Sequence, residues 1–171
     1  TLLVRLDPGS YTAQVSSAAV AAGVALVEVY DASFGSIGAQ KLINVSTRAD
    51  VGTGGDILIV GVVVAGTAPK KLLVRGIGPA LAAFDVTGAL AAPRLQLYRG
   101  SQLLRENTSW SAGTDAALIA AAAVRVGAFA LPDGSKDCAL LLYLAPGSYT
   151  AQISGVANTT GVALVEVYEV P

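Results

Sequence analysis

The feature that most constrains this chain is a repeat of one of its own segments. Residues 1–31, TLLVRLDPGSYTAQVSSAAVAAGVALVEVYD, align without a gap on residues 139–169, ALLLYLAPGSYTAQISGVANTTGVALVEVYE, with 20 identities in 31 positions. Self-similarity of this kind is the sequence signature of a repeat architecture. Because the offset is 138 in a chain of 171 residues, we predict one complete unit, residues 32–171, preceded by an orphan β-hairpin segment, residues 1–31.

Short runs of Val, Leu, Ile and Tyr, separated by Gly, Pro, Asn and Asp, predict a chain made mostly of strands. One helix is expected at residues 115–126, DAALIAAAAVRV, which is rich in alanine, with Thr114 as its N-cap and Gly127 after its end. The fold class is therefore all-β with one short helix, a β-sandwich or jelly-roll-like unit. The expected strands are residues 2–6, 11–16, 24–30, 41–47, 57–65, 71–75, 94–98, 102–106, 139–144, 149–154 and 162–169.

A weaker sequence similarity relates two pairs of segments within the complete unit. KLLVRGIGP at residues 71–79 followed by APRLQLYRG at 92–100 resembles ALLLYLAPG at 139–147 followed by GVALVEVYE at 161–169. This pattern predicts an internal repeat of related hairpins, although short aliphatic strands resemble one another by default.

The composition excludes several classes of function. The chain has no histidine, so it has no Ser-His-Asp or Cys-His catalysis and no imidazole metal site. Its 11 basic and 12 acidic residues include no basic run longer than Lys70-Lys71. The sequence therefore does not predict a basic surface that could contact the phosphates of a nucleic acid. We therefore expect no enzyme activity, no catalytic residue, no cofactor, no metal and no nucleic-acid partner. The single Cys138, in an apolar stretch, is expected to be an inert buried thiol.

A mean hydropathy of +0.61 raises the question of a membrane. Residues 8–27 and 138–165 are uncharged and long enough to cross one. Each contains Pro-Gly-Ser-Tyr-Thr and further polar residues, which are costly in hydrocarbon and typical of hairpin turns. These stretches are predicted to be buried strands, and the chain is not expected to span a membrane.

Several longer motifs carry a resemblance to a known family. RLQLYRGSQLLREN from Arg94, together with LAPGSYTAQISG and the closing strand, resembles the bacterial pre-peptidase C-terminal domain. The unit as a whole, with LINVSTRADVGTGGDILIVGVVVAG and LLVRGIGPALAAF, is similar to an uncharacterised tandem β-sandwich repeat of large exported bacterial proteins. The resemblance implies a secreted β-sandwich with structural or adhesive duty. Pre-peptidase domains often hold calcium at acidic turns, but the corresponding turn here reads Glu106-Asn107-Thr108 and lacks their paired aspartates.

Three turns have some of the residues of a ligand site. Gly76-Ile-Gly78-Pro-Ala-Leu81 follows a strand as a dinucleotide fingerprint does, but it ends in Leu and no βαβ unit surrounds it. Residues 52–56, GTGGD, lack the Lys-Ser/Thr of a phosphate loop and are expected to be a hairpin connection. Residues 133–137, DGSKD, offer too few oxygens for a hard cation and are expected to be a solvated turn.

The position of five further side chains in the repeat or in a loop predicts their roles. Glu28 and Glu166 occupy equivalent positions and are expected to be outward-facing charges that protect sheet edges from wrong pairing. Tyr11 and Tyr149, each after Pro-Gly-Ser, are expected to be substantially buried. Trp110 in the polar loop 107–113 either folds back on the core, which we favour, or stacks on a sugar ring.

These observations predict a structural extracellular or cell-surface protein that associates with itself, head to tail, into a fibre, stalk or surface layer. The orphan segment would expose an apolar patch that marks an assembly interface. The alternative is a non-catalytic carbohydrate-binding or adhesive module, whose partner would be a cell-surface or environmental polysaccharide. The residues of the predicted interface are Leu2, Val4, Leu6, Val24, Leu26 and Val29.

Overall fold

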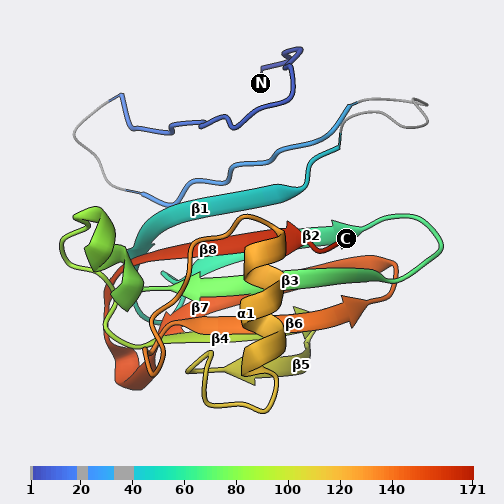
Figure 1. The fold of residues 1–171 in the computed structure, drawn as a ribbon. Helices are drawn as coiled ribbons and strands as arrows, with labels where there is room; N and C mark the ends of the chain where they lie inside the picture. Colours follow the sequence, from blue (N-terminus) through green and yellow to red (C-terminus); the bar gives the residue numbers. More distant parts are fainter. Residues whose placement is uncertain (1, 19–22, 33–40) are drawn as a thin grey trace. The chain divides into compact units, whose positions relative to one another are not determined.

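The computed structural model describes residues 2–18, 23–32 and 41–171, and it divides into two compact units (Figure 1). The first unit is Thr1–Leu42 and the second is Ile43–Pro171. The boundary predicted from the sequence, after Asp31, falls within the described part of the first unit.

The second unit is a sandwich of two four-stranded antiparallel sheets, as the sequence predicted. The first sheet has the order β1-β8-β3-β6 and the second has the order β2-β7-β4-β5. The strands are β1 (Asn44–Val51), β2 (Leu58–Val64), β3 (Lys70–Ile77), β4 (Pro93–Arg99), β5 (Gln102–Asn107), β6 (Cys138–Leu144), β7 (Gly147–Gly155) and β8 (Gly161–Glu169).

Consecutive strands change sheets along much of the chain. β1 pairs with β8 and β2 pairs with β7, so the turn between β1 and β2 passes from one sheet to the other. The expectation of a hairpin at residues 52–56 is therefore wrong, although these residues do form a turn, in which Gly52 N–H donates to the Asp56 carbonyl. The two pairs of similar segments do not form equivalent hairpins either. The first pair gives β3 and β6, which are neighbours in one sheet, whereas the second pair gives β4 and β8, which lie in different sheets.

The main core lies between the two sheets. Strand side chains alternate between faces, so every second residue of an inner strand points into the sandwich. On β8 these residues are Ala163, Val165 and Val167, which are at most 8% exposed, as the alternation predicted. They pack with buried residues of both sheets, among them Val74, Leu95, Leu97, Leu140 and Ile153.

The outer face of the first sheet is covered as well. The helix α1 (Ala116–Arg125) lies across it in Figure 1, and Ile119 and Ala122 pack on Leu73 and Ala139. The 3₁₀ helices are η1 (Pro79–Phe84), which covers the end of β3, and the short η2 (Val156–Asn158). Because both faces are covered, β3 is buried from Leu72 to Ile77. The outer face of β8 is half-buried at Leu164 and Tyr168, as the sequence predicted, whereas Glu166 on the same face is buried.

The predicted elements of the second unit all exist, with ends that shift by up to about four residues, as is usual for element boundaries. The helix has Asp115 rather than Thr114 at its N-cap, and Gly127 follows with a positive φ of 71°. The helix η1 was not predicted. The expected strand at residues 41–47 is found as β1, which begins at Asn44.

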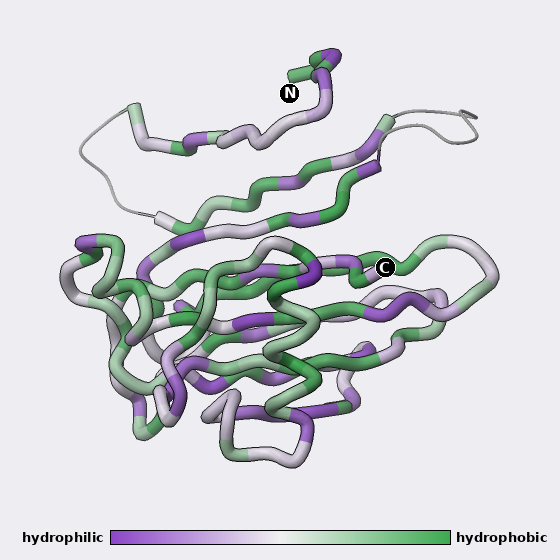
Figure 2. Tube along the Cα trace, in the orientation of Figure 1, coloured by the Kyte–Doolittle hydropathy of each residue, from purple (hydrophilic) through white to green (hydrophobic). Residues whose placement is uncertain are grey.

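The first unit contains no strand in its described residues, 2–18, 23–32 and 41–42. The strands expected at residues 2–6, 11–16 and 24–30 are therefore not formed there. A strand is stable only when its backbone groups and its apolar face have partners, and a two- or three-stranded piece rarely supplies enough of both. Hydrophobic colour nevertheless runs along this unit as it does along the strands of the sandwich (Figure 2).

Candidate functional site

The predicted assembly residues lie in the first unit with their side chains exposed. Residues 2–18 and 23–32 are exposed throughout. In a folded monomer, apolar side chains of this number are normally covered, and a larger exposed patch marks an interaction site. The exposed fractions are 84% for Leu2, 53% for Val4, 46% for Leu6, 92% for Val24, 84% for Leu26 and 56% for Val29.

The copy of this segment in the second unit is buried. An offset of 138 residues relates Val15 to Ile153, Val27 to Val165 and Tyr11 to Tyr149. The exposed fraction is 60% at Val15 and 0% at Ile153, and it is 52% at Val27 and 1% at Val165. The same sequence therefore forms core inside the sandwich of the second unit and is exposed in the first unit.

Local contacts are the same in both copies. The Tyr149 hydroxyl donates to the Ala145 carbonyl at 2.7 Å, and the Tyr11 hydroxyl donates to the Asp7 carbonyl at 2.8 Å. Tyr149 is 4% exposed, which confirms its predicted burial, whereas Tyr11 is 58% exposed, so that prediction is wrong. The hydrogen bond is local and forms within four residues, but burial of the ring needs the opposing sheet.

A buried ion pair crosses the outer face of the first sheet. Arg75 on β3 lies directly opposite Glu166 on β8, with 3.2 Å between Arg75 Nε and Glu166 Oε2. Their side chains are 1% and 8% exposed. Arg75 Nη1 also donates to the Phe129 carbonyl at 2.8 Å, and the guanidinium carbon lies 4.4 Å from the centre of the Phe129 ring. The pair joins the two central strands to the loop that covers them.

This pair corrects the interpretation of Glu166 as a charge that protects a sheet edge. β8 lies between β1 and β3, so Glu166 is on an interior strand. The Tyr168 hydroxyl donates to Glu166 Oε1 at 3.0 Å, and the Tyr30 hydroxyl donates to Glu28 Oε1 at 3.1 Å in the other copy. Burial raises the pKa of Glu166, and Arg75 and Tyr168 oppose that rise. Burial, followed by the charge of Glu166, raises the pKa of Tyr168 to about 12.

The turn that resembled a dinucleotide fingerprint is occupied by a side chain of the protein itself. The backbone N–H groups of Gly78 and Ala80 donate to Asp137 Oδ1 at 2.8 and 3.2 Å. A Cβ on Gly78 would overlap the carbonyl of Leu90, which explains the glycine by close packing. Asp137 is 0% exposed, so the expectation of a solvated turn at residues 133–137 is wrong at its last residue.

Two other predicted side chains are held by the fold. Cys138 is buried, as predicted, and burial raises the pKa of its thiol to about 12. Trp110 is half-buried against the cluster beneath α1, and its indole N–H donates to the Pro132 carbonyl at 2.9 Å. It therefore folds back on the body of the unit, the outcome favoured from the sequence.

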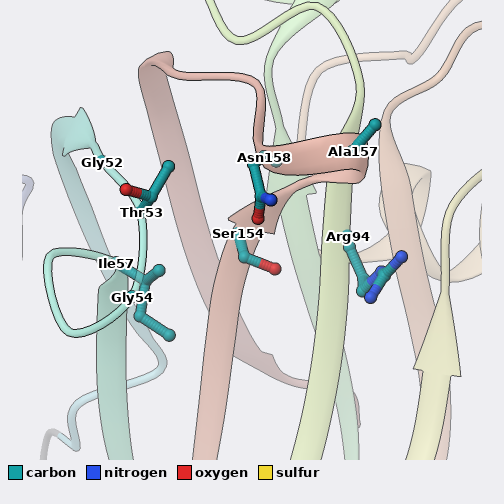
Figure 3. Close-up of a pocket in the computed structure, with 9 residues that line it drawn as sticks. Gly52, Thr53, Gly54, Ile57, Arg94, Ser154, Ala157 and Asn158 are labelled. Atoms are coloured by element: carbon teal, nitrogen blue, oxygen red, sulfur yellow. The ribbon is translucent and has the colours of Figure 1, made fainter.

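An open depression of about 360 Å³ lies at the end of the sandwich where β1 passes to β2 (Figure 3). Its polar side chains are Thr53 in the turn between β1 and β2, Arg94 on β4, Ser154 on β7 and Asn158 on η2. Arg94 Nε is buried and has no hydrogen-bond partner among the described residues. Ala157 and Asn158 adopt left-handed φ angles of 54° and 60°, which turn the chain sharply at this rim. The depression offers hydrogen-bond donors from a guanidinium, two hydroxyls and an amide, but no aromatic ring.

Residues 2–18, 23–32 and 41–171 contain no group of three or more Cys, Asp or Glu side chains placed to hold a metal ion. In the same part of the chain, no helix is long and apolar enough to cross a membrane.

The two packed sheets define the second unit as a β-sandwich. No protein-family model matches the chain, and no curated protein matches it. Among solved structures, it is similar to the pre-peptidase C-terminal domain of a collagenase from Bacillus anthracis. That match has a TM-score of 0.43 and 10% identity, and it covers 73% of this chain and 89% of the other.

Proposed function

We propose that this chain is a non-catalytic structural protein of the cell exterior that associates with its own kind, head to tail, into a fibre, stalk or surface layer. The observation that carries the proposal is the first unit, where a copy of a core segment holds its apolar side chains in solvent. A contact between two different surfaces of a subunit passes from one subunit to the next, and it produces a filament when the rotation between subunits does not close a ring.

The polar groups of the second unit support a structural role. Arg75 and Glu166 bind one another, and Asp137 accepts hydrogen bonds from the backbone of a turn. These contacts hold strands and loops together, and all three side chains are buried. The external location rests on the sequence resemblance to repeats of exported bacterial proteins.

Removal of residues 1–31 tests the proposal. We expect the full chain to form polymers visible by electron microscopy and heavy species in sedimentation, and the truncated chain to remain a monomer. Polymers of undiminished length from the truncated chain would exclude this segment as the connector. A control with Arg5→Ala keeps the segment and changes only a side chain whose repeat equivalent, Tyr143, is 71% exposed.

The second candidate function is polysaccharide binding, and the depression around Arg94 favours it. Guanidinium, hydroxyl and amide donors can bind sugar hydroxyls or uronate carboxylates. Affinity electrophoresis in gels that contain neutral or acidic polysaccharides tests this candidate. Retardation that Arg94→Ala abolishes would support it, and equal mobility of the two proteins in every gel would exclude this depression.

A further inference from the structure

Residues 2–31 repeat three particular strands of the sandwich. By the offset of 138, residues 2–6 correspond to β6, residues 9–17 to β7 and residues 23–31 to β8. The places of these strands in the second unit therefore specify what the repeated segment needs as neighbours.

Two of the three strands are interior strands. β8 is hydrogen-bonded to β1 on one side and to β3 on the other, and β7 is hydrogen-bonded to β2 and to β4. An interior strand needs a partner on each side and packs through one face into the core. Addition of the segment to a free edge of a finished sheet would satisfy only one side of one strand. Edge addition is therefore the wrong geometry for this sequence.

The charge of Glu28 also requires a neighbouring strand, one that carries a cation. Its equivalent, Glu166, faces Arg75 directly across from β3, and both side chains are buried. A carboxylate at this place loses its water when the strand is covered, which is costly without a cation beside it. Glu28 keeps the local tyrosine contact, through Tyr30. The covering strand is therefore expected to present an arginine, as β3 does, and a merely apolar groove is not a suitable site.

We propose that residues 2–31 are the last three strands of a second sandwich, completed by another polypeptide segment with the β1–β5 framework of residues 43–137. The segment inserts into both sheets of that framework, with its β7-like and β8-like strands between framework strands. Glu28 pairs there with the arginine that corresponds to Arg75, and the side chains of Tyr11, Val15 and Val27 enter the core. This inference rests on the proposed structural role and names the partner as a framework whose three last strand places are unfilled, whether it is joined ahead of residue 1 or lies on a separate molecule.

A fusion of residues 41–138 directly ahead of residue 1 tests the inference. Residue 1 aligns with residue 139, so the junction restores the order of a unit. We expect amides of residues 2–18 and 23–31 to exchange with solvent about a thousandfold more slowly in the fusion than in the 171-residue chain, because they join a globally stable fold. Val15→Asp in this segment should abolish the protection, since Ile153 at the equivalent position is 0% exposed. Arg5→Ala should leave it unchanged.

The charge pair has its own control in the fusion. Glu28→Met alone should reduce the protection, because it leaves the framework arginine buried without its partner, and changing that arginine to Met as well should restore it. Equal exchange rates in the fusion and the parent chain, with residues 43–171 still protected in both, would overturn the inference. That result would leave self-assembly intact as a function, because the fusion measures pairing within one chain whether or not molecules polymerise.

A second measurement uses the framework as a separate probe. A polypeptide of residues 41–138 mixed with the 171-residue chain should sediment with it at a ratio of one to one, and should not do so with the Val15→Asp chain or a chain without residues 1–31. Capture shows that the framework can come from another molecule. Absence of protection in the fusion refutes the inference whether or not capture is seen.

Discussion

Replacement of Arg75 by methionine removes one half of the buried ion pair and leaves Glu166 in place. Methionine keeps most of the length and apolar contact of the arginine stem, so the main change is the loss of the positive charge. Both side chains are at most 8% exposed, and an unpaired charge at such a site typically costs about 3–5 kcal/mol. For a unit of this size we expect the melting temperature at pH 7 to fall by roughly 10–20 °C.

The stability lost in the Arg75→Met variant should depend on pH, because Glu166 is titratable. Burial raises the pKa of Glu166 above its usual value, and Arg75 opposes that rise. Without Arg75 the pKa in the folded state rises further. The folded variant then keeps a proton that the unfolded chain loses near about pH 4.3, so its stability falls by about 1.4 kcal/mol per pH unit until the folded pKa is reached. The destabilisation should therefore be small near pH 4 and largest near pH 7.

Urea unfolding at pH 4 and pH 7, followed by circular dichroism, measures this difference. The double variant Arg75→Met with Glu166→Met is the matched control, because it removes both charges and should recover most of the stability at pH 7. If the Arg75→Met chain is as stable as the wild type at pH 7, or if its loss is the same at both pH values, the pair does not stabilise the fold through its charges.

Three further predictions compare sites within the chain. Tyr149→Ala should cost about 3–5 kcal/mol, while Tyr11→Ala, at the equivalent but exposed position, should leave the melting curve of the isolated chain unchanged; equal losses would contradict this. Gly78→Ala should cost about 1–3 kcal/mol because its Cβ meets backbone, whereas Gly61→Ala, which meets nothing, should be neutral in thermal unfolding. Cys138, with a pKa raised to about 12, should react with a thiol reagent at pH 8 only after urea unfolds the chain, so fast labelling of the native protein would show that the thiol is accessible.

The sandwich could be predicted because its strands and its helix are indicated by patterns within short stretches of sequence. Residues 162–169 alternate between a core face and an outer face, and the structure places Ala163, Val165 and Val167 in the core. Gly127 ends the helix with a left-handed backbone, which its sequence position indicated. The same local reasoning failed at residues 52–56, because a turn between two strands looks alike whether they pair with each other or enter different sheets.

The buried polar groups could not be predicted because their partners are distant in sequence. Arg75 and Glu166 become neighbours only when β3 and β8 pair, and Asp137 meets Gly78 only when β6 lies beside β3. A single charged residue in an apolar strand reads as exposed on composition alone, since most such residues are. A signal was nevertheless present: glutamate and tyrosine two residues apart recur in both copies, as Glu28 with Tyr30 and Glu166 with Tyr168.

The two copies are most similar in the segments that correspond to strands with a neighbouring strand on each side. Residues 8–14 and 23–30 are identical to residues 146–152 and 161–168, which include most of the interior strands β7 and β8. Between them, residues 17–22 share only one identity with residues 155–160, which form an end loop where Ala157 to Thr160 are exposed. A surface segment without a partner would need only an apolar pattern. Residues 2–31 also keep Tyr11, the equivalent of the buried Tyr149, and Glu28, the equivalent of the glutamate that faces Arg75 on β3. This selective match indicates that the segment is shaped for the interior of a sandwich rather than for an edge or an unspecific apolar surface.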